Sequence, residues 1–400
     1  MAGNLRGQNI FFFGLIREDG FADYIAANLL RRGATVYCLA APELTEEREA
    51  ELALRKIHVI KTPLWYGLKD DEYPEAFKSL KKPEDILHYA VDDDFIDTVF
   101  AENEKAAANE VRKIFIELGI KTKGKVDGII HIMAGGIPRT RGMMMLTKGM
   151  LGTADPAKFI PMQRFVESDV FQKIVARNIN LVTATSYEHI FTHGNAVLAA
   201  NPRCNIIALG YNGEHIMDTN HQYSFASYPG YLVGYAKKHL LEIADRYRAK
   251  SYKATVVNLM GAETASTNAF AGIENFVVNS FRQMDQAGHE ISALKQQCEA
   301  LLKPGITMEQ VVANADQYLY APAIQGIQDG SFPLLTSLAT AEVTLQVSEQ
   351  FQDFHIDRKK LVAYEISRFV KTLMAEHFWD QFDENTSSTL LLDVKQLMEQ

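Results

Sequence analysis

Short apolar runs alternate with helical stretches over residues 1–280, and this alternation limits the fold more than any other feature. The runs are apolar along their whole length, like strands that are buried on both faces of a sheet. They cover residues 9–14, 34–40, 126–134, 204–211 and 252–260. Stretches with helical periodicity and basic last turns lie between them, at residues 21–33, 94–119 and 234–250. This order predicts a doubly wound parallel sheet, whose ligands bind at the carboxyl ends of the strands.

The pattern changes near residue 281. Helical periodicity continues, with no clear strand, through four further segments at residues 281–302, 307–319, 338–351 and 356–379. We therefore expect an α/β domain of residues 1–280, followed by a helical C-terminal extension of residues 281–400.

Composition and charge narrow the class of protein. The 400 residues are 47% apolar and 23% charged, which is typical of a soluble globular chain. The net charge of −9 argues against a nucleic acid or an acidic membrane as the main partner. No apolar run has membrane-spanning length, and no secretory signal is visible. The scattered cysteines, Cys38, Cys204 and Cys298, suit a reducing cytoplasm and provide no disulfide or metal framework.

The turn after the first apolar run carries a phosphate-binding pattern, in the stretch FFFGLIREDGFADYIAANLLRRGATVY from Phe11 to Tyr37. Gly14 permits a sharp turn at the end of the strand. The helix from about Gly20 offers free N–H groups and a partial positive charge to a phosphate. The usual dinucleotide fingerprint has three glycines here, whereas this loop has two. The stretch indicates a pyrophosphate site, and an ordinary strand-to-helix turn is the alternative.

The order and spacing of five motifs resemble those of the enoyl-acyl-carrier-protein reductases, a divergent branch of the short-chain dehydrogenase/reductase superfamily. The motifs are G-x5-G-F-A in the first turn, FIDTVF (95–100), DGIIHIMAGG (127–136), SYEHIFTHGNAVLAANPRCNIIALGY (186–211) and VVNLMGAETASTNAFAGI (256–273). The resemblance implies a Rossmann-like fold. It also implies that a nicotinamide coenzyme reduces the C=C bond of an enoyl thioester.

The same resemblance implies which residues hold the coenzyme. They are Gly14, Ile16, Gly20 and Phe21 in the first turn, Ala41 after the second strand, Met133, Ala134 and Gly135 after the fourth, and Ala265 and Thr267 after the sixth. Ala265 falls beside the carboxamide of the coenzyme, and Thr267 with Ser266 falls beside its phosphates.

A tyrosine and a lysine at the start of a long helix carry the chemistry in this superfamily. The tyrosine hydroxyl donates to the enolate oxygen, and the lysine binds the ribose and adds positive charge. The segment 227–243 offers two pairings: Tyr231 with Lys238 has the Y-x6-K spacing of the common enoyl reductases, and Tyr228 with Lys237 has the Y-x8-K spacing of a longer class. Only one of two adjacent lysines faces the coenzyme, because consecutive helical residues lie about 100° apart. The G-x-A-K context favours Lys237, and with it Tyr228.

Tyr211, at the end of the fifth run, corresponds to a tyrosine that lines the active site of the common enoyl reductases. A simple ketoreductase has a serine near this point, whereas this chain has Gly210. The pattern therefore favours C=C over C=O reduction. The alternatives are a ketone or aldehyde reductase and a nucleotide-binding protein without catalysis.

The coenzyme and partners follow from smaller features. Residues 40–43, after the second strand, include no basic side chain that would bind the 2′-phosphate of NADPH, which favours NADH. Arg17 in the first turn can still reach a 2′-phosphate. We expect a cytoplasmic enzyme whose substrate is a thioester of acyl carrier protein or CoA. By analogy, we expect a homodimer or homotetramer. We expect no metal, because the pair His189 and His193 lacks a third ligand.

Overall fold

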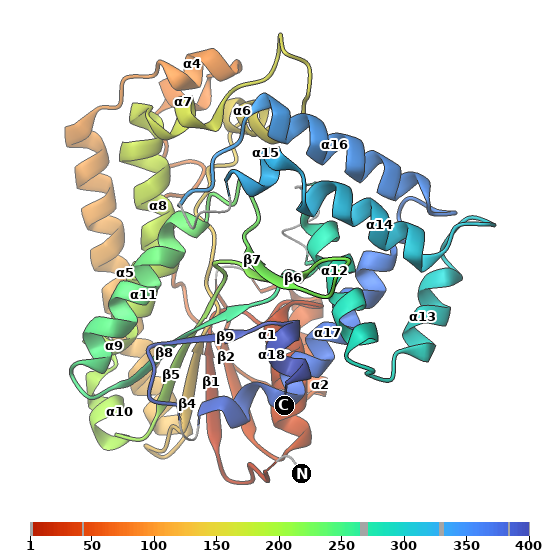
Figure 1. The fold of residues 1–400 in the computed structure, drawn as a ribbon. Helices are drawn as coiled ribbons and strands as arrows, with labels where there is room; N and C mark the ends of the chain where they lie inside the picture. The colour runs from red at the N-terminus through yellow and green to blue at the C-terminus, as the bar shows by residue number, and fades with distance from the viewer. Residues whose placement is uncertain (1–2, 42–43, 265–270, 328–331, 383–384, 400) are drawn as a thin grey trace.

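The computed structural model describes residues 3–41, 44–264, 271–327, 332–382 and 385–399, and its centre is a seven-stranded sheet (Figure 1). The strand order is β3-β2-β1-β4-β5-β8-β9, and all neighbours are parallel. The strands are β1 (Asn9–Phe13), β2 (Thr35–Leu39), β3 (His58–Ile60), β4 (Gly128–His131), β5 (Asn205–Gly210), β8 (Lys253–Leu259) and β9 (Thr389–Leu392). The predicted doubly wound α/β fold is thus confirmed, with the switch point between β1 and β4.

Two strand features were not expected from the sequence. A two-stranded antiparallel hairpin, β6 (Glu214–Met217) and β7 (Tyr223–Ala226), is inserted after β5. The expectation that no strand follows residue 280 is corrected by β9, which pairs with β8 from Val256 opposite Thr389 to Leu259 opposite Leu392. The C-terminal segment therefore completes one edge of the sheet.

One face of the sheet is covered by helices of the N-terminal two thirds of the chain. Phe11 and Phe13 of β1 point to this face and pack on Phe115 of α5. Figure 1 shows these helices on one side of the sheet. They are α5 (Asp93–Lys121), α8 (Ala176–Asn180) between the π-helical turns η1 (Val170–Val175) and η2 (Leu181–Thr185), α9 (Ser186–His193), α10 (Asn195–Ala200) and α11 (Gly234–Arg248).

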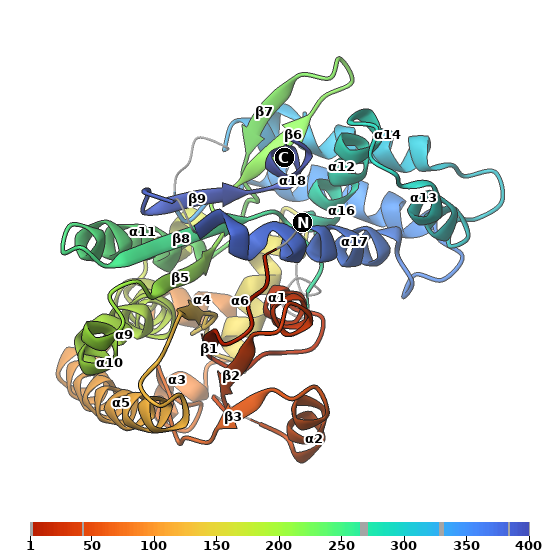
Figure 2. The ribbon, with the colours of Figure 1, turned by 90° about the horizontal axis from the view of Figure 1, so that it is seen from below.

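The other face is covered by α1 (Phe21–Arg31) and by elements from the C-terminal third. Ile10 and Phe12 of β1 point to this face and share one core with α12 and α17. Figure 2 shows α17 beside α1, on the side of the sheet opposite to α5, α9 and α10. The expected boundary at residue 280 falls inside α12. Side chains of the sheet and of the C-terminal helices also belong to one core. These C-terminal elements are α12 (Ile273–Gln286), α17 (Val362–Phe378), η4 (Trp379–Phe382) and α18 (Val394–Met398).

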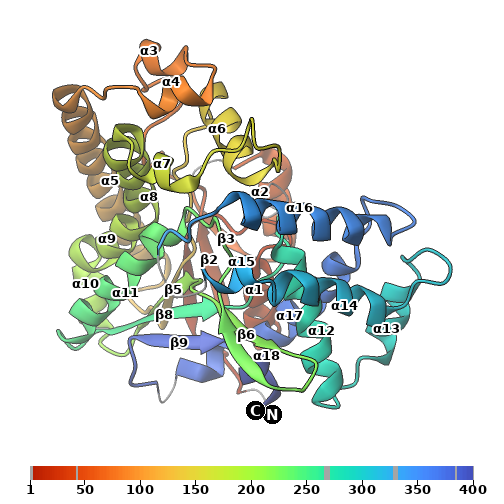
Figure 3. The same cartoon turned by 45° about the horizontal axis from the view of Figure 1, so that its top comes forward.

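Further helices lie around these layers. The hairpin lies against α12, with a group of helices above and beside them (Figure 3). That group is α13 (Ser292–Glu299), α14 (Met308–Leu319), α15 (Pro322–Gln325) and α16 (Leu338–Asp353). The other short helices are α2 (Glu46–Leu54), α3 (Glu75–Lys78), α4 (Pro83–Leu87), α6 (Arg141–Leu151) and α7 (Met162–Val166). Within the described residues, none of the helices combines the length and the hydropathy that crossing a membrane requires.

Replacing Gly128 tests the packing of the C-terminal segment on the sheet. A Cβ at Gly128 would lie 2.2 Å from the Trp379 ring, at the start of β4. We therefore expect Gly128→Ala to lower the free energy of unfolding by about 1–3 kcal/mol, as overpacking does. Gly3→Ala is the matched control, because its Cβ meets only the end of the Arg32 side chain at 3.5 Å. Urea unfolding measures both, and equal midpoints would contradict the Trp379 contact.

Candidate active site at the carboxyl edge of the sheet

The first turn has the shape that a close approach of a ligand requires. Gly14 follows β1 with φ of 135°, and a Cβ there would lie 2.7 Å from the side chain of Ile132. The turn is held to the second strand, since Leu15 N–H donates to the Ala41 carbonyl at 3.1 Å. Ile16 is buried, and its carbonyl accepts two hydrogen bonds from Arg48 at 3.0 and 2.8 Å. A side chain at Gly14 is therefore excluded on steric and conformational grounds.

The helix α1 begins where this turn ends. Gly20 is its N-cap in an extended conformation, and no side chain caps the helix. Phe21 is the first helical residue and is half-buried. The first N–H groups of α1 carry the positive end of the helix dipole to the edge of the sheet next to Gly14. This is the geometry by which helix termini bind phosphate groups.

The segment after β4 forms the other side of the switch point. Met133 is buried, whereas Ala134 is exposed. Gly135 has φ of 146°, and its N–H donates to the Thr183 hydroxyl at 3.4 Å. The two sides, after β1 and after β4, are adjacent because Phe13 and His131 are register neighbours. Of the predicted coenzyme residues, Ala265 and Thr267, with Ser266, lie outside the described residues.

The structure separates the two candidate lysines. Lys237 is buried near the start of α11, and its ammonium donates to the Leu209 carbonyl of β5 at 2.6 Å. Burial lowers the pKa of Lys237 to about 8. Lys238 is exposed on the same helix. Burial and the Lys237 charge together hold the pKa of His131 well below its usual value, so this buried histidine is neutral.

The three candidate tyrosines lie in one cluster between the hairpin, α12 and α14. The rings of Tyr211 and Tyr231 meet edge to face, with centroids 5.7 Å apart. The Tyr228 hydroxyl donates to the Ala271 carbonyl at 2.9 Å. Burial raises the pKa of the Tyr228 hydroxyl well above its usual value, so it is protonated and able to donate.

Glu214 is a buried carboxyl that the sequence analysis did not identify. It begins the hairpin, is 1% exposed, and accepts the Gly261 N–H at 2.7 Å and the Tyr211 hydroxyl at 3.5 Å. Burial, reinforced by the charge of Asp393, raises the pKa of Glu214 to about 8. An acidic residue just after a strand was its only sequence signal, and that signal is common in loops.

Comparison with known proteins identifies the family. A family model described as "Enoyl-acyl carrier protein reductase FabMG" matches residues 31–397. The chain belongs to the FabMG family of enoyl-acyl carrier protein reductases. The comparison with curated proteins finds no significant match.

Two solved FabMG structures are similar to this chain over nearly its whole length. The apo structure of FabMG has a TM-score of 0.91 and 21% identity, and the match covers 100% of this chain and 94% of that one. The NADH-bound structure of FabMG has a TM-score of 0.75 and 20% identity, with 98% and 94% covered. At these identities the structural likeness shows the fold.

FabMG membership confirms the resemblance to divergent enoyl-acyl-carrier-protein reductases and the predicted enoyl reductase function. Membership of this family also supports reduction of a C=C bond over reduction of a C=O bond, which the residues around Tyr211 had predicted. The roles of single residues stay predictions, and so do the oligomeric state and the cytoplasmic location.

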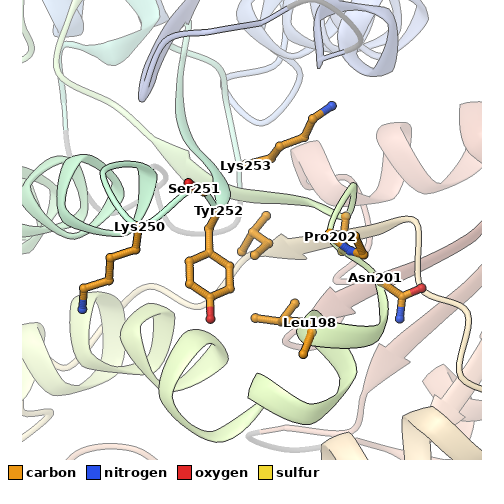
Figure 4. Close-up of a pocket in the computed structure, with 10 residues that line it drawn as sticks. Leu198, Asn201, Pro202, Lys250, Ser251, Tyr252 and Lys253 are labelled. Atoms are coloured by element: carbon orange, nitrogen blue, oxygen red, sulfur yellow. The ribbon is translucent and has the colours of Figure 1, made fainter.

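A pocket of about 130 Å³ lies at the opposite edge of the sheet (Figure 4). Leu198 and Asn201 line it on one side, and residues 250–253 line it on the other. Residues 205 and 253 begin β5 and β8, so this pocket is at the amino ends of the strands. Ligands of doubly wound sheets bind at the carboxyl ends, so this pocket is separate from the candidate active site of this FabMG-family chain.

Replacing Glu214 in this FabMG-family enoyl reductase tests the desolvation of that carboxyl. A folded-state pKa of about 8, above the value in the unfolded chain, favours the folded state at acid pH. This contribution is lost as the pH rises from about 5 through 8, at about 1.4 kcal/mol per pKa unit at most. Glu214→Gln removes the titration, so we expect the wild type to lose stability relative to this variant over that range.

Urea unfolding at pH 5, 6.5 and 8 measures this difference. Glu47→Gln, an exposed change on α2, is the control and should follow the wild type at each pH. Parallel pH profiles for the wild type and Glu214→Gln would contradict the desolvated state of Glu214.

Proposed function

We propose that this chain transfers a hydride from NADH to the C=C bond of an enoyl thioester carried by acyl carrier protein. The observation that supports this most is the buried ammonium of Lys237 at the carboxyl end of β5. A lysine is almost never buried without a partner, and this one has a single carbonyl acceptor among the described residues. Two of its three N–H donors are therefore available for a ligand.

NADH, when bound, would supply a hydride, which carries the two electrons of the reduction, to the β-carbon of the substrate. The C=C electrons then move to the thioester oxygen, which becomes an enolate oxygen. A tyrosine hydroxyl donates a hydrogen bond to this oxygen, and Lys237 adds positive charge and binds the ribose. A proton from water then adds to the α-carbon, which gives the saturated thioester.

The contrast between the two lysines supports Tyr228 as the donor. The Y-x6-K pairing requires Lys238, which is exposed, whereas the Y-x8-K pairing joins Tyr228 to the buried Lys237. The Tyr228 hydroxyl already donates, to the Ala271 carbonyl. The substrate oxygen would replace that carbonyl as the acceptor.

The surroundings of Tyr228 suit an apolar substrate. A cavity of about 20 Å³, lined in part by Met150 and Leu151 of α6, lies beside the tyrosine. Such a volume holds about one water molecule, so an acyl chain must displace the side chains that line it. Methionine adapts well to this task because its side chain is flexible.

The charges near the second strand support NADH rather than NADPH. Arg48 and Arg55 lie behind the first turn, and both are paired with Asp23 and Glu51. A 2′-phosphate needs a cation that is free to bind it, and neither Arg48 nor Arg55 is free. Arg17 of the first turn is exposed and is the cation that the NADPH alternative would use. The solved FabMG complex also contains NADH.

Tyr228→Phe is the direct test of the donor. We expect it to lower turnover of a crotonyl thioester by on the order of 10²–10⁴-fold, because the enolate loses its donor, while NADH affinity stays unchanged. Tyr231→Phe is the matched control and should stay within a few-fold of the wild type. The loss of nicotinamide absorbance measures turnover. If only Tyr231→Phe loses activity, the Y-x6-K pairing holds and this assignment is wrong.

Substrate and coenzyme panels on the wild type test the reaction itself. Oxidation of NADH with a crotonyl thioester but not with an acetoacetyl thioester is expected. Faster turnover with the acyl carrier protein thioester than with the CoA thioester would support acyl carrier protein as the carrier. Faster turnover with NADH than with NADPH would support NADH as the coenzyme. Binding of NADH without turnover on any thioester would favour a nucleotide-binding protein instead.

The charge of Lys237 should set an alkaline limit to activity. Its pKa of about 8 means that the cation is present below that pH and is lost above it. We expect kcat/KM for NADH to fall above about pH 8. In Lys237→Arg the guanidinium stays charged, so the fall should move to higher pH even if the rate is lower. Equal pH profiles for the wild type and Lys237→Arg would exclude Lys237 as the titrating group.

A further inference from the structure

A second buried lysine lies behind the proposed coenzyme site and comes from the C-terminal third. Lys371 of α17 has a fully buried side chain, with 0% of its surface exposed. Its ammonium donates to the Asp19 carbonyl at 2.6 Å, to the Asp19 carboxylate at 3.0 Å and to the Glu263 carbonyl at 3.1 Å. An ammonium has three N–H donors, so all of them are used inside the protein.

These acceptors belong to two different loops. Asp19 is in the first turn, next to the N-cap Gly20 of α1. Glu263 follows β8, four residues after the end of that strand. Because both loops leave the carboxyl edge of the sheet, Lys371 joins the two loops at that edge. Figure 2 shows that α17 runs beside α1.

Ser367 strengthens the same bridge. It lies one helical turn before Lys371, on the same face of α17, and is also fully buried. Its hydroxyl accepts the Glu263 N–H at 2.8 Å. Ser367 and Lys371 therefore hold the N–H and the carbonyl of one residue, which fixes the orientation of the chain after β8.

Tyr24 completes the contacts of Asp19. Its hydroxyl donates to the Asp19 carboxylate at 2.7 Å, and the Lys371 ammonium lies 5.0 Å from the centre of its ring. Asp19 has φ of 56°, in the left-handed region that few residues other than glycine adopt. The contacts with Lys371 and Tyr24 stabilise this conformation at the residue that leads into α1.

We infer that Lys371, supported by Ser367, is a positioning residue for the coenzyme: it holds the first turn and residues 260–264 after β8 in the arrangement that binds the diphosphate. The inference rests on the proposed coenzyme site. The ammonium also counters the negative charge of Asp19, which would otherwise repel a diphosphate at the start of α1. This gives the C-terminal helices a function in catalysis, through the coenzyme loops and without contact with the substrate.

Lys371→Met tests this inference, since it removes the ammonium and keeps an unbranched apolar side chain. We expect the Kd and KM for NADH to rise by about ten-fold or more, because NADH binding to the variant must order the loops that these hydrogen bonds hold in the wild type. The kcat at saturating NADH should stay within about three-fold, because Lys371 does not touch the reacting atoms. Fluorescence titration with NADH and steady-state kinetics with a crotonyl thioester measure these quantities.

Three further variants separate positioning from general stability. Lys360→Met removes an exposed lysine from the loop before α17 and should match the wild type. Ser367→Ala and Tyr24→Phe each remove one contact of the bridge and should raise the KM for NADH by a smaller factor than Lys371→Met. Urea unfolding shows whether Lys371→Met folds. If it does not fold, Ser367→Ala and Tyr24→Phe test the inference in its place.

The outcomes distinguish this inference from the proposed function. If the wild type binds no NADH, the coenzyme site is wrong and the inference falls with it. If the wild type binds NADH and the folded bridge variants bind it equally well, only the inference is overturned. A fall in kcat with an unchanged KM would also overturn it, because positioning of the coenzyme predicts the opposite.

Discussion

A parallel sheet must bury both of its faces, and in this chain each face is buried by a different part of the sequence. The helices that follow β4 and β5 cover one face, together with α5. The other face is covered by α1, by Leu52 of α2 and chiefly by elements that follow β8, such as α12 and α17. Without them, apolar side chains of β4, β5 and β8 would be in water, at about 25 cal/mol for each Å² exposed. The C-terminal helices are therefore part of the sheet's core.

This covering also determines where the inserted hairpin lies. Asn279 of α12 exchanges two hydrogen bonds with the backbone of Met217, at 2.9 and 2.8 Å. Gln283, one turn later, donates to the His215 carbonyl, and buried Asp393 accepts from the backbone and ring of His215. The hairpin carries Glu214 at its start and is followed by Tyr228. The tyrosine cluster is thus held in place by residues that are 50 to 180 positions away in the sequence.

Local patterns were sufficient to predict the strands and helices that bury a continuous apolar face. The five apolar runs became β1, β2, β4, β5 and β8 with ends shifted by few residues. In contrast, β9 has only four residues and follows the polar stretch 385–388. Its apolar side chains alone do not distinguish a strand from an irregular C-terminal segment. Its pairing depends on the free edge of β8, which exists only once the sheet has formed.

The site residues divide in the same way. The positions of Gly14 and of the segment after β4 could be predicted, because backbone geometry at strand ends follows from glycine and from sheet topology. The G-x-A-K context already favoured Lys237 over Lys238, and the burial of the Lys237 side chain, which no local pattern predicts, supports that prediction. Lys371 was not found, because a lysine in an amphipathic helix usually faces water. Only the contact of α17 with the first turn gives that residue a partner.

The two buried lysines illustrate how hydrogen-bond capacity separates roles that charge alone does not. Both lie near the carboxyl edge of the sheet, and burial lowers the pKa of each. Lys371 has three oxygen acceptors within the protein, so it has no donor left for a ligand and can act only through the loops that it joins. Lys237 has one acceptor among the described residues. A cation buried with spare donors is costly in an empty site, and a bound ribose would lower that cost by accepting from them.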